Sequence, residues 1–160
     1  MPSNNPSIDI YTDGSCHTQH LIGGWAAILF TGTDKIVLTG KEEDTTHNRM
    51  ELTAVIKAIE YVKTNYNHVT TVNIFSDSQY VTGLPGREEK LSAAGFTSKS
   101  GKDIQNADLV KELLALASSI TIVFTKIRAH QKKNDTINHN IEADKLSRKI
   151  VRDAVNTLNS

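Results

Sequence analysis

Four carboxylates in this chain lie where an apolar segment begins or ends: Asp13, Glu51, Asp77 and Asp144. Two carboxylates about 4 Å apart repel by roughly 4 kcal/mol at an effective dielectric constant near 20, so acids that converge need protons or cations. Carboxylate oxygens favour Mg²⁺ or Mn²⁺, and two such ions can hold the attacking and leaving oxygens of a phosphoryl displacement. The four acids therefore predict a divalent-metal site with the chemistry of a nuclease.

Each acid also has an ordinary structural explanation. Asp13 can form a turn, and Asp77 can stabilise the N-terminus of a helix. Glu51 can belong to a capping box, and Asp144 can form an ion pair with Arg148 one helical turn later. For any one acid alone the structural explanation is the stronger, whereas the joint arrangement of the four favours the metal site.

The elements that position these acids are indicated by the periodicity of the apolar residues. Alternating or continuous apolar segments predict strands at 7–12, 25–30, 35–40, 69–75 and 120–124. Helical periodicity and N-capping residues predict helices at 48–62, from 76 to about 82, at 106–117 and from about 138 to 158. Three leading strands, followed by alternating helices and strands, indicate an α/β fold with a sheet of mixed direction.

These elements bring the acids toward one edge of the sheet. Asp13 and Asp77 each directly follow a predicted strand, and the ligands of α/β sheets gather at the carboxyl ends of strands. Glu51 falls in the first turn of its helix, and Asp144 falls in the second turn of the last helix. Two helices must therefore bring the remaining carboxylates to the same edge.

The composition is that of one soluble domain. We expect a single domain over 1–160, with a disordered tail at 1–6 and an irregular protrusion at 87–105. The single cysteine, Cys16, excludes an internal disulfide and a Cys-rich zinc site. The longest apolar run, 25–30, is too short to cross a bilayer, and the polar start does not resemble a secretory signal. A cytoplasmic monomer without a membrane partner is the expectation.

The net charge of zero conceals an asymmetry between the two halves of the chain. Residues 1–80 hold five Lys or Arg against nine Asp or Glu, whereas residues 81–160 hold thirteen against nine. A cation site beside a polyanion track would have this distribution. From the charges alone, scattered solvated side chains are the preferred explanation.

The acids and their neighbours form four spaced motifs, Tyr11–Cys16, Thr45–Leu52, Ser76–Val81 and Asn140–Asp144. Together they resemble the motifs of type 1 ribonuclease H, the bacterial form in particular, in order from residue 7 to about 150. The resemblance implies a ribonuclease H-like five-stranded mixed sheet, with three antiparallel strands first and parallel additions after them, flanked by helices. It also implies a metal-dependent endoribonuclease that hydrolyses the RNA strand of RNA·DNA hybrids and leaves 5′-phosphate and 3′-hydroxyl ends.

The family pattern gives each acid a role in a two-metal-ion mechanism. Asp13 is expected to bridge two Mg²⁺ ions, for which Mn²⁺ can substitute, and Asp144 to help hold the ion that activates water. Glu51 and Asp77 are expected to hold the ion near the leaving oxygen. His130 matches a loop histidine of the family that assists proton transfer or product release, although an exposed loop histidine is an equally ordinary explanation.

Four further residues match the positions through which the family binds the hybrid. Asn48 and Gln79 match residues that recognise the RNA 2′-hydroxyl, a task that suits amides because they both donate and accept hydrogen bonds. Thr46 and Asn106 match positions that bind a phosphate of the DNA strand. Each of these two residues can equally be a helix cap, and at Asn106 the two roles can coexist.

The protrusion departs from the family's basic, tryptophan-bearing pattern. Its Lys and Arg residues are diluted by Glu88, Glu89 and Asp103, and Phe96 is its only aromatic residue. We therefore expect hybrid affinity that is weaker than in such members and that depends little on salt concentration. The protrusion is nevertheless expected to handle substrate.

Three alternatives to a ribonuclease H remain at this stage. A non-catalytic module that binds hybrid or duplex could lose its acids, whereas all four acids are present. A resolvase-like or integrase-like metal nuclease would share the clustered acids but not the placement of Asn48 and Gln79. A hydrolase of small phosphoesters would need a compact ligand pocket, which no motif of the chain resembles.

Overall fold

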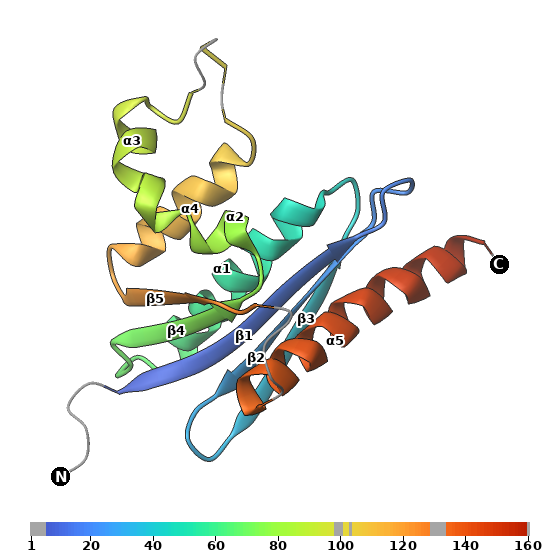
Figure 1. Ribbon diagram of the computed structural model, residues 1–160, viewed down its shortest axis with the longest axis horizontal. Helices are drawn as coiled ribbons and strands as arrows, with labels where there is room; N and C mark the ends of the chain where they lie inside the picture. Colours follow the sequence, from blue (N-terminus) through green and yellow to red (C-terminus); the bar gives the residue numbers. More distant parts are fainter. Residues whose placement is uncertain (1–5, 98–100, 103, 129–133, 160) are drawn as a thin grey trace.

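A five-stranded sheet forms the centre of this computed structural model, which describes residues 6–97, 101, 102, 104–128 and 134–159 (Figure 1). The strands are β1 (Ser7–Cys16), β2 (Gly23–Phe30), β3 (Lys35–Glu42), β4 (Thr71–Ser76) and β5 (Thr121–Lys126), in the spatial order β3-β2-β1-β4-β5. β2 pairs antiparallel with β1 and β3, whereas β4 pairs parallel with β1 and β5. The predicted mixed sheet, with three antiparallel strands first, is confirmed.

Helices cover both faces of the sheet (Figure 1). One face carries α1 (His47–Asn65), α2 (Gln79–Thr82), the 3-10 turn η1 (Pro85–Arg87), α3 (Glu88–Ala93) and α4 (Ala107–Ala117). The other face carries α5 (Asp135–Leu158), which packs against β1, β2 and β3. The short helix α3, which lies in the segment predicted to protrude, projects beyond the sheet (Figure 1).

The main core lies between the sheet and α1. Leu52, Val55, Ile59 and Val62 have no exposed surface, so the predicted apolar stripe of this helix is confirmed. A smaller core lies under α5, where the ring of Tyr11 stacks on that of Phe75. The ring of His139 packs against those of Tyr11 and Phe30 in this second core.

Several element boundaries differ from the expectations. β1 does not end before Asp13 but continues to Cys16, because β2 begins earlier than expected and pairs with this segment. The strand β5 is half exposed rather than buried, because it forms an edge of the sheet. The last helix begins at Asp135, after Asn134, whose side chain caps it, so Asp144 lies in the third turn rather than the second.

Two expectations concern the termini and the membrane. The expected N-terminal tail, 1–6, lies outside the described residues except for Pro6. Within the described part of the chain, no helix combines the length and the apolar character that crossing a bilayer requires.

Candidate metal centre

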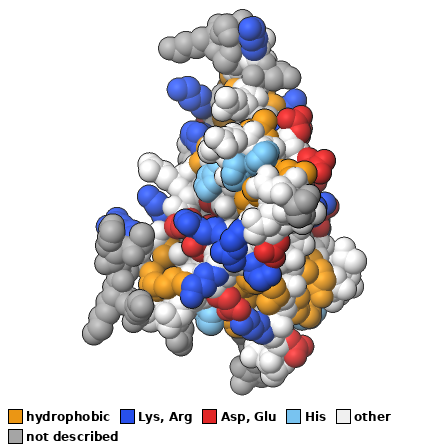
Figure 2. Space-filling view, turned by 90° about the vertical axis from the view of Figure 1, so that its right-hand side faces the viewer, with side chains coloured by type: hydrophobic (Ala, Val, Ile, Leu, Met, Phe, Trp, Pro, Cys, Tyr) orange, Lys and Arg blue, Asp and Glu red, His pale blue; other side chains and the backbone are white. Residues whose placement is uncertain are grey.

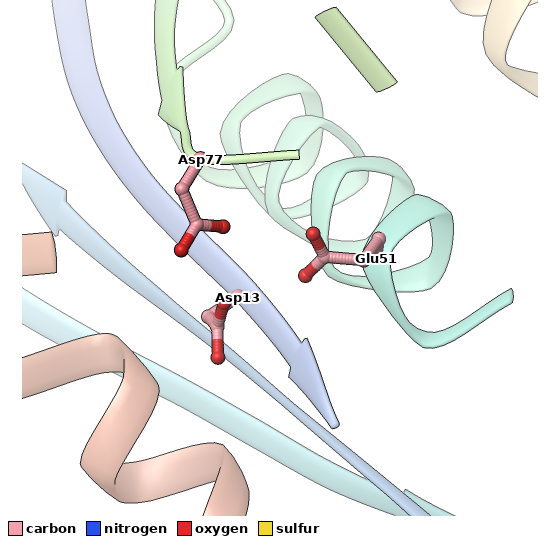
Figure 3. A group of neighbouring side chains, drawn as sticks. All are labelled: Asp13, Glu51 and Asp77. Atoms are coloured by element: carbon pink, nitrogen blue, oxygen red, sulfur yellow. The ribbon is translucent and has the colours of Figure 1, made fainter. Parts of the chain in front are cut away.

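Three of the four predicted acids converge at one edge of the sheet. Asp13, Glu51 and Asp77 each offer a carboxylate oxygen, and these oxygens all lie within 4.8 Å of one another. Figure 3 shows the three side chains pointing toward a common space from β1, from α1 and from the end of β4. Among the described residues this is the one group of three or more Asp, Glu, His or Cys side chains with such spacing.

Asp13 lies inside β1 rather than after it. The parallel pairing of β1 with β4 ends at Tyr11, opposite Phe75, while the antiparallel pairing with β2 continues past Asp13. At Asp13, β1 is therefore paired with β2 on one side but no longer with β4 on the other. The Ser147 hydroxyl, fully buried on α5, donates a hydrogen bond of 2.7 Å to Oδ2 of Asp13.

Glu51 reaches the same space from α1. Its side chain is buried, and Oε1 accepts a hydrogen bond from the backbone N–H of Gly14. A Cβ atom at position 14 would overlap the backbone of Met50 and Glu51, so glycine is what allows the strand and the helix to approach this closely. The glycine that follows Asp13 thus contributes to the site by close packing rather than by a turn.

Asp77 directly follows β4, as the sequence predicts, and is exposed. The chain turns there because the Ser76 hydroxyl accepts a hydrogen bond from the backbone N–H of Ser78 at 3.0 Å. The Ser78 side chain in turn caps α2 by accepting a hydrogen bond from the backbone N–H of Val81. Asp77 is therefore held in a turn between a strand and a capped helix, facing the other two acids (Figure 3).

Asp144 borders the group without belonging to it. Its charge acts on Asp13 and Asp77, and its side chain also interacts directly with that of Asp13, but Asp144 does not lie within 4.8 Å of all three acids. Oδ1 of Asp144 accepts a hydrogen bond of 2.9 Å from Nε of Arg148. The ion pair considered as its structural explanation is thus present, and it is compatible with a position next to the metal site.

Burial and mutual repulsion raise the pKa values of the clustered carboxyls. Desolvation is the largest cause at Asp13, Glu51 and Asp77. The charges of Asp77 and Asp144 raise the pKa of Asp13 further, and those of Asp13 and Asp77 do the same at Glu51. Because oxygen donors alone form the group, a hard divalent cation suits it, and the cation would relieve the repulsion.

Beside the acids lies a second feature, the α1–α4 hollow. It has a volume of about 340 Å³ and is lined by Thr46, His47, Asn48, Gln105 and Asn106. Thr46 caps α1 by accepting a hydrogen bond from the backbone N–H of Arg49. Three of the four residues expected to bind the hybrid therefore line one hollow, while the fourth, Gln79, is exposed at the start of α2.

Asn106 is not a side-chain cap of α4. It occupies the N-cap position in the left-handed conformation, with φ of 62°, and its side chain makes no capping hydrogen bond. Its amide instead bonds to Arg49 and to Tyr80. The sequence therefore correctly predicted Asn106 at the N-cap position of α4, but its side chain does not form the expected capping hydrogen bond.

Sequence reasoning missed Ser147, Gly14 and Arg49 as parts of the site. Ser147 stands three residues after Asp144, which places both on neighbouring positions of one helix face and is a usable signal. The contacts of Gly14 and Arg49 join distant segments, and no local pattern indicates them. His130 lies outside the described residues.

Comparisons with known proteins agree with this geometry. Residues 5–152 match the family model described as RNase H. A ribonuclease H of Wolbachia sp. subsp. Drosophila simulans (strain wRi) is 37% identical over 148 residues, which cover 92% of this chain and 97% of that protein. A ribonuclease H of Thermoanaerobacter sp. (strain X514) is 36% identical over 132 residues, which cover 81% of this chain and 83% of that protein.

Solved structures share the fold. LC9-RNase H1, a type 1 RNase H with the type 2 active-site motif, is similar with a TM-score of 0.77 and 22% identity, over 94% of this chain and 74% of that one. LC11-RNase H1 in complex with an RNA/DNA hybrid has a TM-score of 0.68 and 18% identity, over 92% and 99% of the two chains. The family model and the relatives span nearly the whole sequence, and the chain therefore belongs to the ribonuclease H family.

Proposed function

We propose that this nuclease hydrolyses the RNA strand of RNA·DNA hybrids by a two-metal-ion mechanism that leaves 5′-phosphate and 3′-hydroxyl ends. The observation that carries the proposal is the convergence of Asp13, Glu51 and Asp77 on one space, with Asp144 beside them. Membership of the ribonuclease H family supplies the class of reaction.

The four acids would hold two Mg²⁺ ions, or Mn²⁺ in their place. Asp13 is central, because it interacts electrostatically with each of the other three acids, Glu51, Asp77 and Asp144. Bound ions would lower the pKa of the attacking water and offset the charge on the departing 3′-oxygen. Ser147 and Gly14 hold two of these carboxylates in place by donating hydrogen bonds to Asp13 and Glu51.

Recognition of RNA would come from Asn48 and Gln79. Asn48 is half-buried in the first turn of α1, one turn before Glu51, and Gln79 begins α2 two residues after Asp77. Each amide therefore accompanies an acid of the metal site. An amide can donate to and accept from the 2′-hydroxyl, which DNA lacks.

The DNA strand would be held at the α1–α4 hollow through one phosphate. The N-termini of α1 and α4 both border this hollow, so their unpaired backbone N–H groups and their dipoles favour an anion there. Thr46 uses its oxygen to cap α1, which leaves its hydroxyl hydrogen to donate. Asn106 would add an amide donor.

Basic residues on α5 extend the surface available to a polyanion. Lys145, Arg148, Lys149 and Arg152 are exposed on this helix. Figure 2 shows Lys and Arg side chains gathered in the middle of the face that carries the end of α5, with Asp and Glu between and around them. This supports nucleic-acid binding of modest electrostatic strength.

His130 is proposed to assist proton transfer or product release, and the match of its motif supports that role.

A strand-labelled cleavage assay tests the function. The purified protein is incubated with Mg²⁺ and end-labelled RNA·DNA, RNA·RNA, DNA·DNA and single strands. Cutting confined to the RNA of the hybrid, with 3′-hydroxyl ends and complete loss in EDTA, is expected. Cleavage of DNA duplexes would favour a resolvase-like nuclease, and tight hybrid binding without any cutting would favour a binding module.

A further inference from the structure

We propose that Arg49 is a positioning residue for the DNA strand: it fixes the direction of the Asn106 amide at the α1–α4 hollow, and Asp108 anchors it in that task. This inference rests on the proposed function, because it concerns the site at which the DNA phosphate would bind.

The Asn106 amide is held at both ends. Nη1 of Arg49 donates a hydrogen bond of 3.4 Å to Oδ1 of Asn106, and Nδ2 of Asn106 lies 3.3 Å from the hydroxyl oxygen of Tyr80, to which it donates. The amide nitrogen carries two hydrogens, and Tyr80 takes one of them. The second hydrogen is available for a phosphate in the hollow that Asn106 lines.

Arg49 determines which end of the amide is the oxygen. A guanidinium has donors and no acceptor, so the amide atom that faces it must be Oδ1, and the NH₂ group must point elsewhere. Without this donor the amide can turn over. It would then direct a carbonyl oxygen toward the phosphate position, where two acceptors repel each other instead of forming a hydrogen bond.

Arg49 acts on the substrate through Asn106, because Asp108 and Asn106 together accept hydrogen bonds from three of its five guanidinium N–H donors. Nη1 and Nη2 donate to the two carboxylate oxygens of Asp108 at 3.0 and 2.9 Å, a bidentate pair that joins α1 to α4. This donation holds the pKa of Asp108 at about 2. The charge of Arg49 is thus offset, and what it contributes is the orientation of Asn106.

A second feature of Asn106 makes this support necessary. Its backbone is left-handed, with φ of 62°, and its side chain makes no capping bond to α4 that could fix it. The side-chain direction therefore depends on Arg49 and Tyr80. Lysine could not replace Arg49, because a single ammonium lacks the planar fork that spans Asn106 and Asp108 together.

The test uses binding, so that it does not depend on cleavage. Hybrid affinity is measured in EDTA for the wild type, Arg49→Met, Arg49→Lys and Asp108→Asn. The probes are hybrids that carry one neutral methylphosphonate, moved step by step along the DNA strand. Glu60→Gln is the matched control, because it breaks an ion pair, with Lys57, in the C-terminal half of α1, and neither residue lines the hollow.

We expect wild-type affinity to fall at one methylphosphonate position, where the phosphate enters the hollow. In Arg49→Met, affinity for the unmodified hybrid should fall about tenfold, the cost of one misdirected hydrogen bond to a charged group, and the extra loss at that position should vanish. Arg49→Lys and Asp108→Asn should reduce the positional loss, whereas Glu60→Gln should retain it in full.

Two results would overturn the inference. One is an equal loss of affinity for every probe in the Arg49 variants, which is what a merely structural role predicts. The other is the absence of any sensitive position in the wild type. Neither result touches the proposed cleavage of RNA, which the strand-labelled assay decides separately. Thermal unfolding checks that each variant folds, and Asp108→Asn carries the test if Arg49→Met does not.

Discussion

The metal centre and the α1–α4 hollow lie one helical turn apart on α1, yet the charged side chains are clustered with like charges in the first and paired with opposite charges in the second. At the metal centre, Asp13 and Glu51 are buried beside further acids, and burial and repulsion raise their pKa values. At the hollow, Arg49 and Asp108 are paired, and the pKa of Asp108 is lowered because Arg49 donates to it.

The contrast indicates which kind of ligand each region favours, a cation or an anion. A group of acids without a cation stores repulsion, which a divalent metal would release on binding. At the hollow, Arg49 and Asp108 already neutralise each other, so there is no repulsion for a cation to relieve. The hollow offers oriented neutral hydrogen-bond donors instead. In the proposed function, the first region would carry out chemistry on a phosphate, and the second would hold one. Four predictions test whether the two regions have these different roles.

Asp13→Asn should produce the largest effect. In the proposed mechanism Asp13 would bridge two metal ions, so its loss would remove one ligand from each. The cleavage rate should therefore fall by about three orders of magnitude or more, as is typical when one member of a group of catalytic residues is lost. Single-turnover cleavage of a labelled hybrid in Mg²⁺ measures the rate. Full activity in this variant would show that the acids do not hold catalytic metal, and circular dichroism would show whether the fold is intact.

Ser147→Ala should weaken metal binding without destroying the site. The lost hydroxyl donates to Oδ2 of Asp13 at 2.7 Å, and removing such a support of a metal ligand typically lowers metal affinity by about 10- to 100-fold. The Mg²⁺ concentration for half-maximal cleavage should rise accordingly, while the rate at saturating Mg²⁺ recovers most of its value. An unchanged Mg²⁺ dependence would mean that the hydroxyl serves only packing.

The stability of the metal-free protein should fall as pH rises. The pKa is raised to about 7 at Asp13 and to about 9 at Glu51, so over this range the folded state binds more protons than the unfolded chain. The stabilising effect of these protons is complete below the unfolded pKa values near 4 and is lost as pH rises through the folded ones. Urea unfolding in EDTA should lose at least about 1 kcal/mol between pH 5 and pH 9.

Two comparisons sharpen this measurement. Asp13→Asn removes one of the repelling charges, so its stability should decrease less over the same pH range. Added Mg²⁺ should restore stability at high pH in the wild type. A wild-type profile in EDTA that is flat or rises with pH would contradict the stored repulsion, and the comparison between the two regions would then fail.

The sequence predicted most of the framework and the identity of the acids because those signals are local. The apolar stripe of Leu52, Val55, Ile59 and Val62 depends only on helical spacing, and each acid belongs to a short motif. The position of Asp13 inside β1 could not be read locally, because it depends on how far β2 pairs with that strand. The hydrogen bonds of Asn106 depend on Arg49, 57 residues away.

The smallest expected effect concerns salt. If the hollow holds its phosphate through neutral donors and Arg49 stays paired with Asp108, hybrid binding releases few counterions, and affinity should depend only weakly on salt concentration. The acids Glu88 and Glu89 in the first turn of α3 act in the same direction. Asp108→Asn should change the slope of log affinity against log salt by less than about one unit, the change expected for one phosphate contact, because Arg49 acts through the neutral amide of Asn106. A steep slope in the wild type, with no change in Asp108→Asn, would place the binding energy on the Lys and Arg residues of α5 instead.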